Sequence, residues 1–312
     1  MSQKQWHPDI EVTATLAKHC IETQFQQLSP IKKIQCIGEG WDNKAYLVND
    51  AIIFRFPHRT IAVDLIEREN QVLQALQSRF SIAIPNPQYL GKPSEHYPYP
   101  FHGYPVIKGL SGCHAKLSRR ERQASIQPLA LFLKALHTIS ETEAPELGAQ
   151  DQWVDRTNTA RMTEMLAERV ENINRQNIVT IDNTVFEAEV SIANALKLTE
   201  YPKVLVHGDL YCRHLLFDQG QLSGIIDWGD SGINIPSIDL ALLYSFYPAE
   251  AHPAFFAIYG EVDSELLKHA RFLALYSMLT VLLYGDDIGD KQLVIEAKRA
   301  IKEINPKLLS HC

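Results

Sequence analysis

The segment from 204 to 228 combines residue types suited to metal-assisted group transfer. It reads VLVHGDLYCRHLLFDQGQLSGIIDW, with the apolar arms LLF and LSGII on either side of the turn DQGQ. Apolar arms around a short polar turn predict a β-hairpin. Because a hairpin brings its open ends together, we expect His214 and Asp227 to face one cleft, with Asp209 on the loop that enters it. One carboxylate can then hold a cation while the other orients a hydroxyl nucleophile.

The spacing of these residues follows the pattern of a kinase catalytic loop. Protein kinases carry H-x-D-L-x-x-x-N and, further on, an Asp in a DFG motif. The segment from His207 to His214 fits every fixed position but the last, and Asp227-Trp228-Gly229 stands where DFG would. The plain alternative is a buried histidine and two solvated aspartates. HGD alone is a weak signal, but HGDL, a hairpin and IIDWGD in this order favour the functional interpretation.

This segment resembles the aminoglycoside phosphotransferase family, and most closely its aminoglycoside 2''-phosphotransferases and macrolide phosphotransferases. The similarity continues through GDSGINIPSIDLALLY and spans the chain from about Ile31 to about Tyr284. The resemblance implies that Asp209 orients and deprotonates the acceptor and that Asp227, with His214, holds Mg²⁺. His214 replaces the usual Asn, although imidazole is a poor partner for a hard cation. The same subgroup carries His at this position.

The first part of the chain offers candidate phosphate-binding residues. In IGEGWDNKAYLV, Gly38 and Gly40 lie in a turn between two expected strands, where backbone N–H groups can approach phosphates. An ordinary tight hairpin explains the two glycines equally well. The resemblance favours a nucleotide loop that runs from Gly38 to Asn43.

A cation and a carboxylate follow that loop. Arg55, in AIIFRFP, occupies the strand on which kinases keep a Lys for the α- and β-phosphates, and its planar guanidinium suits a phosphate clamp. An exposed strand arginine is the alternative. The resemblance assigns Glu69 as the ion-pair partner of Arg55, with Glu67 as the second candidate, although most helix glutamates are only solvated.

YPYPFHGYPVIKG resembles the segment that joins the two lobes of the family. The resemblance places Tyr104 at the back of the purine pocket, and it makes the Pro105 carbonyl and the Ile107 N–H the partners of the base. The donor is GTP or ATP, and a bulky Tyr104 favours GTP at least as much as ATP. The alternative is a buried edge strand.

Composition limits the class of protein. The net charge of -7 argues against nucleic acid as the main partner and is compatible with a cationic substrate. The five cysteines are scattered without a CxxC pair, so we expect free thiols in a reducing cytoplasm, with no special role for Cys212. The longest apolar run, 272–284, is too short to span a bilayer and predicts a buried helix. We therefore expect no membrane partner. We also expect the protein to be a monomer.

Strand patterns cluster early and helix patterns late, which predicts an α+β fold with two lobes. We expect a helix over 9–26 with Asp9 as N-cap, strands over 32–40, 45–50, 51–57, 84–91 and 104–109, and a helix over 62–76. Later helices are expected over 117–139, 159–177, 185–197, 237–246, 263–284 and 290–303. The interpretation is a small antiparallel nucleotide-binding lobe over 1–107 and a larger, mostly helical lobe over 108–312, as in protein kinases. His137 is interpreted as a core residue.

The acceptor is the least constrained part of the prediction. An aminoglycoside is a polycation, and acidic candidates to meet it are Glu261, Asp263, Glu265, Asp286 and Asp287. A macrolide requires a larger apolar pocket, to which the aromatic stretch 244–259 could contribute. A kinase of a metabolic amino alcohol or sugar stays open, because one scaffold serves many acceptors. So does a non-catalytic nucleotide-binding protein, whereas a protein kinase is disfavoured because no APE-like segment follows Asp227.

Overall fold

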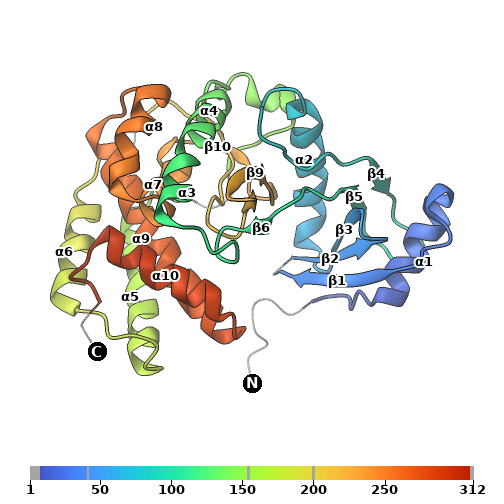
Figure 1. The fold of residues 1–312 in the computed structure, drawn as a ribbon, viewed down its shortest axis with the longest axis horizontal. Helices are drawn as coiled ribbons and strands as arrows, with labels where there is room; N and C mark the ends of the chain where they lie inside the picture. Colours follow the sequence, from blue (N-terminus) through green and yellow to red (C-terminus); the bar gives the residue numbers. More distant parts are fainter. Residues whose placement is uncertain (1–7, 41, 153–154, 199–200, 310–312) are drawn as a thin grey trace.

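Alternating side chains build an antiparallel sheet in the first part of the chain (Figure 1). The computed structural model describes residues 8–40, 42–152, 155–198 and 201–309. The sheet has the strand order β1-β2-β3-β5-β4, with β1 (Ile34–Glu39), β2 (Asn43–Val48), β3 (Ile52–Pro57), β4 (Tyr89–Gly91) and β5 (Phe101–Pro105).

The two faces of this sheet have different partners. On one face Phe54, Phe56 and Phe101 pack with helix α1 (Ala14–Gln24), and the rings of Phe56 and Phe101 stack with centroids 4.5 Å apart. Because side chains alternate along a strand, Arg55 lies on the opposite face, toward helix α2 (Ile61–Leu76). The sheet therefore shields an aromatic core on one side and presents a buried cation on the other.

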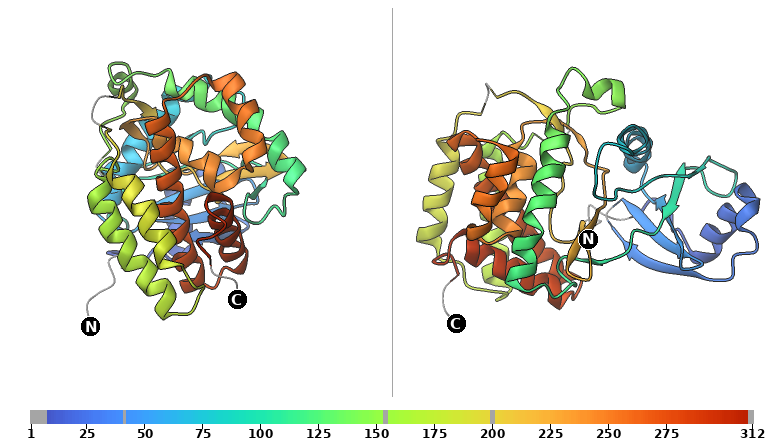
Figure 2. Two further views of the ribbon diagram at one scale, coloured as in Figure 1. Left: turned by 90° about the vertical axis from the view of Figure 1, so that its left-hand side faces the viewer. Right: turned by 45° about the horizontal axis from the view of Figure 1, so that its top comes forward.

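Helices dominate the rest of the chain, and most of their apolar faces share one core. The helices are α3 (Arg119–Ala124), α4 (Ile126–His137), α5 (Thr159–Arg175), α6 (Asn183–Asn194), α7 (Ser237–Phe246), α8 (His252–Tyr259), α9 (Ser264–Asp287) and α10 (Lys291–Ile304). Short 3-10 helices lie at η1 (Gln26–Leu28), η2 (Ala144–Leu147) and η3 (Ala249–Ala251). Figures 1 and 2 show α5 and α6 at the end of this part that is farthest from the sheet.

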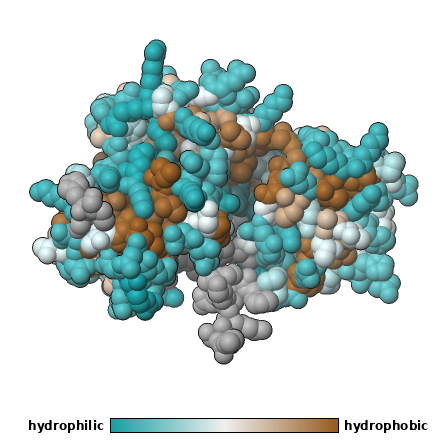
Figure 3. Space-filling view, turned by 60° about the horizontal axis from the view of Figure 1, so that its bottom comes forward, coloured by the Kyte–Doolittle hydropathy of each residue, from teal (hydrophilic) through white to brown (hydrophobic). Residues whose placement is uncertain are grey.

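Two small sheets carry the loops between the helices. Strand β6 (Leu110–Ser111) pairs with β8 (Leu215–Asp218), which forms the expected hairpin with β9 (Gln221–Ile225). Strand β7 (Val204–Val206) pairs with β10 (Gly232–Asn234). The structure confirms the predicted kinase-like α+β fold, an antiparallel sheet followed by a mostly helical part. Figure 3 shows the surface hollowed between these two parts.

Several element boundaries differ from the prediction. Helix α1 begins at Ala14 because Thr13 accepts the N–H of Leu16, whereas the carboxylate of Asp9 accepts the N–H and hydroxyl of Thr60. The expected N-cap at Asp9 is therefore wrong.

The expected helix over 117–139 is two helices, α3 and α4, with the break at Ser125. Pro128 lacks an N–H and is tolerated only in the first turn, so a new helix begins just before it. Only 89–91 of the expected strand 84–91 pairs, because prolines interrupt its first half. Strand β5 occupies 101–105 in place of 104–109.

Helix α9 is long and apolar enough to cross a membrane by length and composition alone. However, 61% of its most apolar window is buried inside the structure, where α9 packs against α7 and α10. It is thus built as the central helix of a protein core, as the apolar run predicts. The cysteines at 20, 36, 113 and 212 are free, and Cys312 lies outside the described residues.

Candidate active site

A buried carboxylate holds the loop that joins β7 to β8, residues 207–214. Asp239, at the start of α7, accepts the N–H of His207 at 2.7 Å and the N–H of Gly208 at 2.9 Å. His137 contacts the same carboxylate at 3.1 Å and the Tyr259 hydroxyl at 2.7 Å. Burial opposes ionisation of Asp239, but the His137 hydrogen bond and charge hold its pKa below the usual value. The loop is therefore anchored by a charged carboxylate, and His137 is structural, as predicted.

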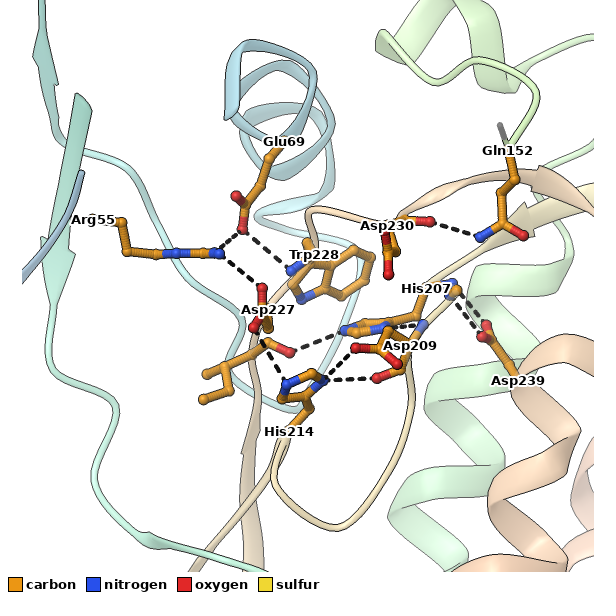
Figure 4. Close-up of polar contacts among 12 residues, drawn as sticks. Arg55, Glu69, Gln152, His207, Asp209, His214, Asp227, Trp228, Asp230 and Asp239 are labelled. Carbon is orange, nitrogen blue, oxygen red and sulfur yellow. Dashed lines mark hydrogen bonds and ion pairs between the residues drawn. The ribbon is translucent and has the colours of Figure 1, made fainter. Parts of the chain in front are cut away.

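The three residues of the predicted centre do converge (Figure 4). The Nδ1 atom of His214 lies 2.7 Å from the Asp209 backbone carbonyl and 3.5 Å from the Asp209 carboxylate. The Nε2 atom of His214 lies 3.3 Å from the Asp227 carboxylate. His214 thus stands between the two aspartates, whose side chains are partly open to solvent.

The charges of this cluster are mutually compensating. Burial would lower the pKa of His214, but Asp227 and then Asp209 raise it to about 9. Burial would also raise the pKa of Asp227, and the charges of Arg55 and His214 hold it well below its usual value. Asp227 adopts a left-handed backbone conformation with φ of 66°, which is unfavourable for a non-glycine residue and typical of functional sites.

Arg55 connects the sheet, helix α2 and Asp227. It lies 2.5 Å from Glu69 and 2.8 Å from Asp227, so Glu69 is the partner and the second candidate, Glu67, is not. Glu69 also accepts the backbone N–H of Trp228 at 3.2 Å. The ion pair therefore ties the small sheet to the segment that carries Asp227.

Two aromatic side chains support this segment from behind. Trp228 is fully buried, and its indole N–H donates to the Ile225 carbonyl at 3.1 Å. The His207 ring lies 4.8 Å from the Trp228 ring, centroid to centroid, and its Nε2 lies 3.1 Å from the Ile226 carbonyl. Burial lowers the pKa of His207, although Asp239 opposes this, so a neutral ring links the catalytic loop to the residue before Asp227.

The sequence interpretation missed a third carboxylate and its partners. Arg156 donates to the Gly208 carbonyl and lies 3.9 Å from the Asp230 carboxylate, while Gln152 donates to the Asp230 carbonyl at 2.7 Å. Burial, and then the charge of Asp209, raises the pKa of Asp230 to about 7. Only the GD of IIDWGD pointed to Asp230; Arg156 lies 52 residues before Gly208 in the sequence and carries no local signal.

The loop requires a residue without a side chain at Gly208. Its φ is 88°, in the left-handed region, and a Cβ there would lie 2.2 Å from the Asp230 carbonyl oxygen and 2.1 Å from Gln152 Nε2. Glycine has no Cβ, so it avoids both the strain of the left-handed conformation and the steric clashes. The HGD sequence therefore reflects a close approach of two backbones.

Gly40 lies in the turn between β1 and β2, as predicted, whereas Gly38 lies within β1 and pairs with Ala45. Gly40 donates its N–H to the Asn43 carbonyl at 2.9 Å, and an added Cβ at Gly38 would meet nothing within 4 Å. The Asn43 side-chain oxygen is buried without a hydrogen-bond partner among the described residues. Residue 41 lies outside the described residues. Space around Gly38 and an unpaired polar atom are what a loop that receives a ligand requires.

On the connection after β5, one carbonyl points away from β3, and one N–H has no hydrogen bond among the described residues. Tyr104 is buried on the sheet opposite Ile53. The Val106 N–H donates to the Ala51 carbonyl at 2.9 Å, and because bonded positions alternate in an antiparallel ladder, the Pro105 carbonyl points away from β3. Among the described residues the Ile107 N–H has no hydrogen bond. These groups are available to a base.

The acidic acceptor candidates do not form one cluster. Glu261 and Glu265 lie near the start of α9, whereas Asp286 and Asp287 lie at its end, about 30 Å away along a helix of this length. Glu265 pairs with Lys268 at 2.6 Å, and Asp263 caps α9 and accepts the Tyr201 hydroxyl. One small acceptor therefore cannot contact all four of these carboxylates at the same time.

The donor atoms present are compatible with Mg²⁺ bound largely through phosphates and water. Asp227 supplies hard carboxylate oxygens, and His214 Nε2 faces the same carboxylate. Magnesium is usually held by one or two protein ligands together with phosphate oxygens and water. Among the described residues no group of three side chains forms a complete metal cage. The pair therefore fits a metal that arrives with a nucleotide.

Residues 33–275 match the model of the phosphotransferase enzyme family. In sequence the chain is similar to "Uncharacterized protein YcbJ" of Bacillus subtilis (strain 168), with 22% identity over 206 residues. That match covers 62% of this chain and 63% of YcbJ, so it spans less than two thirds of the relative.

Solved structures with the same fold include aminoglycoside and macrolide phosphotransferases. The GDP complex of wild-type aminoglycoside 2'-phosphotransferase-IIIa is 26% identical, covers 94% of this chain and 98% of its own, and gives a TM-score of 0.69. The complex of APH(2")-IIia with GDP and kanamycin is 25% identical. The match covers 93% of this chain and 98% of that one, with a TM-score of 0.67. Macrolide 2'-phosphotransferase MphH from Brachybacterium faecium, 16% identical, covers 91% and 98% with a TM-score of 0.56, which supports the fold alone.

Proposed function

Because the chain belongs to the phosphotransferase enzyme family, we propose that it transfers the γ-phosphoryl group of GTP or ATP to a hydroxyl group of a small molecule. The observation that carries this proposal is the placement of His214 between the carboxylates of Asp209 and Asp227, with Arg55 on the far side of Asp227. A base, a cation ligand and a phosphate clamp are then all within one cluster. These are the parts that phosphoryl transfer requires.

In this proposal Asp209 is the catalytic base. Its side chain is partly exposed, its N–H meets His207 Nδ1 at 3.3 Å, and its carbonyl meets His214, so the backbone holds the carboxylate toward the cleft. Asp209 accepts the hydroxyl proton of the acceptor while that oxygen attacks the γ-phosphorus. The bond to the β-phosphate oxygen breaks, and the nucleoside diphosphate leaves. Positioning of this kind contributes about 10²–10⁴ in rate.

Asp227, together with His214 after its Nε2 has lost a proton, would hold Mg²⁺, which supplies charge neutralisation on the transferred group when it is bound. Arg55 and the loop from Gly38 to Asn43 contact the phosphates. Arg55 is already fixed by Glu69, so its guanidinium needs little reorganisation to meet an anion.

The base of the nucleotide lies beside Tyr104, with the Pro105 carbonyl and the Ile107 N–H as its partners. We propose that residues 1–107 form the nucleotide-binding lobe and residues 108–312 the lobe with the catalytic loop and acceptor site. GTP serves at least as well as ATP, because a bulky Tyr104 narrows the space behind the base. Three of the similar structures are complexes with GDP.

For the acceptor we propose an aminoglycoside-like, polycationic molecule. Burial raises the pKa of Asp230, and the nearby negative charge of Asp209 raises it further. The side chains of both aspartates are partly exposed. Such a pair favours an ammonium group near the reacting hydroxyl. APH(2")-IIia, which shares 25% identity, is described with kanamycin. We also propose that the protein acts as a monomer in the cytoplasm, without nucleic acid or membrane partners.

A phosphotransfer screen tests the proposal. Purified protein is incubated with Mg²⁺ and either GTP or ATP, together with separate aminoglycosides, macrolides and amino alcohols, and each acceptor is analysed by mass spectrometry for one added phosphoryl group. We expect a phosphorylated aminoglycoside with wild type and none with Asp209→Asn. Asp218→Asn, which changes an exposed aspartate at the turn end of the β8–β9 hairpin, is the matched control and should retain activity. No product from any acceptor, although the nucleotide binds, would identify a non-catalytic nucleotide-binding protein.

A further inference from the structure

The peptide group between Gly208 and Asp209 is held at both of its ends. Its carbonyl, on Gly208, accepts a hydrogen bond from the Arg156 guanidinium, and its N–H, on Asp209, meets His207 Nδ1 at 3.3 Å. A peptide group is planar, so contacts at its two ends fix its rotation. That rotation sets the direction in which the Asp209 side chain leaves the backbone. Arg156 therefore acts on the carboxylate that the proposed function assigns as the base.

A glycine before Asp209 makes this contact necessary. Gly208 has a φ of 88°, and the close approach of a second backbone excludes a Cβ at this position. Glycine also has the widest conformational freedom of any residue, so the peptide group beside it can rotate at little cost. The groups on either side are fixed, because Asp239 accepts the Gly208 N–H at 2.9 Å and His214 contacts the Asp209 carbonyl at 2.7 Å. Arg156 holds the carbonyl between them from outside the loop.

Arg156 is itself fixed by buried groups of two core helices. His269, on α9, lies with Nε2 3.0 Å from the Arg156 carbonyl and with Nδ1 2.8 Å from the hydroxyl of Ser237, at the start of α7. Both His269 and Ser237 are 0% exposed. A carbonyl only accepts and a hydroxyl can donate, so these contacts define a neutral ring with its proton on Nε2. Burial lowers the pKa of His269 to about 4, which agrees with that state. The backbone of Arg156 is thereby tied to the helical core.

A hydrogen bond, not an ion pair, is the main contact of the Arg156 guanidinium. It lies 3.9 Å from the Asp230 carboxylate, beyond hydrogen-bond range, and the Asp230 side chain is 38% exposed, so solvent screens the attraction. The Gly208 carbonyl accepts directly from Nη1, and a charged donor makes this bond stronger than a neutral donor would. The structure therefore commits the arginine to the backbone of the catalytic loop.

We propose that Arg156 is a positioning residue that holds the peptide group between Gly208 and Asp209 in the orientation required for catalysis. Without its guanidinium the Asp209 carboxylate is still present, but the backbone that aims it is free to rotate. The rate of transfer then falls, whereas nucleotide binding, which the proposed function assigns to other residues, does not change. This role rests on the proposed function, because it takes Asp209 as the base.

Hydrogen–deuterium exchange tests the contact without any substrate. The full-length protein is digested after exchange, and deuterium uptake is compared for the peptide that contains residues 207–214. We expect this peptide to exchange faster in Arg156→Ala than in wild type, and peptides from α9 to be unchanged, because the bond from His269 reaches the backbone. Arg175→Ala, which removes an exposed arginine in the last turn of α5, is the matched control and should exchange as wild type does. Guanidinium ion, at a concentration that leaves the wild-type Tm unchanged, should slow the exchange of Arg156→Ala.

Transfer to kanamycin from GTP in the presence of Mg²⁺ provides the functional measurement. We expect kcat of Arg156→Ala to fall by about 10²-fold, since a displacement of about 1 Å at a reacting group costs that much. The nucleotide Kd and the KM for kanamycin should stay within a few-fold of wild type. Arg156→Lys, which keeps a charged donor, and guanidinium ion added to Arg156→Ala should each restore part of the rate. A contribution to folding alone would lower the Tm without this split or this rescue.

The proposal is overturned if the 207–214 peptide of Arg156→Ala exchanges as it does in Arg175→Ala, or if exchange rises equally in all peptides. A lower rate with unchanged loop exchange also overturns it, because Arg156 would then act on the reactants directly. A loop that exchanges faster while kcat is unchanged overturns the catalytic consequence. If wild type transfers to no acceptor, the proposed function fails and the catalytic role of Arg156 fails with it, whereas the exchange comparison still reports on the loop. The two failures are therefore distinguishable.

Discussion

Replacing Arg55 with Met tests whether one buried ion pair holds the sheet and helix α2 to the segment that carries Asp227. Arg55 lies 2.5 Å from Glu69, and the Glu69 residue is 2% exposed. In Arg55→Met the donor that the Glu69 carboxylate keeps among the described residues is the Trp228 N–H, at 3.2 Å. A buried carboxylate is thereby left without a compensating charge.

The expected loss of stability follows from that geometry. Breaking a buried pair by removing one partner costs about 3–5 kcal/mol. The pair with Asp227 adds little, because the Asp227 side chain is 43% exposed and therefore screened by solvent. At about 2 °C per kcal/mol, the Tm falls by roughly 6–10 °C. We expect Glu69→Gln in the same background to recover most of the loss, because the amide carries no charge.

The pH dependence gives a second signature. Burial raises the pKa of Glu69, and Arg55 opposes that rise, so Arg55→Met raises the pKa further. A carboxyl group whose pKa is higher in the folded state than in the unfolded state stabilises the folded protein most at a pH below the unfolded pKa, about 4.3. That contribution is lost as the pH rises through the folded pKa. The Tm deficit of Arg55→Met relative to wild type should therefore be larger at pH 8 than at pH 5.5.

The measurement is a double-mutant cycle: thermal and urea unfolding of wild type, Arg55→Met, Glu69→Gln and the double variant. Glu67→Gln, on the exposed side of α2, and Arg79→Met, from a surface pair with Glu143, are matched controls with an expected change below about 1 kcal/mol. The reasoning is refuted if Arg55→Met is as stable as these controls, or if the double variant is no more stable than Arg55→Met.

Further predictions concern the catalytic cluster. Asp209→Asn should lower kcat by about 10²–10⁴ and leave the nucleotide Kd and the Tm nearly unchanged; turnover within a few-fold of wild type removes Asp209 as the base. Asp227→Ala should abolish the enhancement of nucleotide binding by Mg²⁺, measured by titration with and without the metal. His214→Asn should keep measurable transfer, because an amide oxygen can bind the cation; a folded but inactive variant contradicts the metal-ligand role. Tyr104→Ala should change the ratio of kcat/KM for GTP and ATP, and a strong ATP preference in wild type contradicts the assigned role.

Local patterns were sufficient to predict the hairpin and the family. The hairpin of β8 and β9 follows from its two apolar arms and its polar turn, and its geometry brings His214 to Asp227. Arg55 and Glu69 were paired from the family pattern alone, and the structure places them in contact. The family match confirms the prediction of a phosphotransferase.

The residues that the sequence did not reveal are those whose partners lie far along the chain. Asp239 was part of a recognised run, but its bonds to His207 and Gly208 require α7 to pack beneath the loop. Arg156 reaches Gly208 across about fifty residues. A charged residue within an otherwise apolar helix, as in SIDLALL, is the one signal that could have marked Asp239 as buried and paired.

The acidic candidates on α9 lie apart for a related reason. Composition identifies carboxylates, but only the path of the helix shows that Glu265 and Asp286 lie at opposite ends of it. Asp263 and Glu265 are also accounted for locally, by the helix cap and by Lys268. Sequence reasoning therefore predicted the contacts among Arg55, Glu69, His214 and Asp227, whereas the acidic candidates for the acceptor do not lie together.

The charges around Asp227 also explain how an acidic cleft can receive a polyanion. In the free protein Arg55 and His214 neutralise Asp227, and Arg156 lies near Asp230. Under the proposed function, a nucleotide that arrives with a divalent cation would allow these pairs to exchange: Asp227 would meet the cation, and Arg55 would meet phosphate. Each charge then has a partner before and after binding, so the site avoids the desolvation cost of an unpaired ion in either state. Neutralising Asp227 alone should therefore weaken the binding of the metal–nucleotide complex more than that of the metal-free nucleotide.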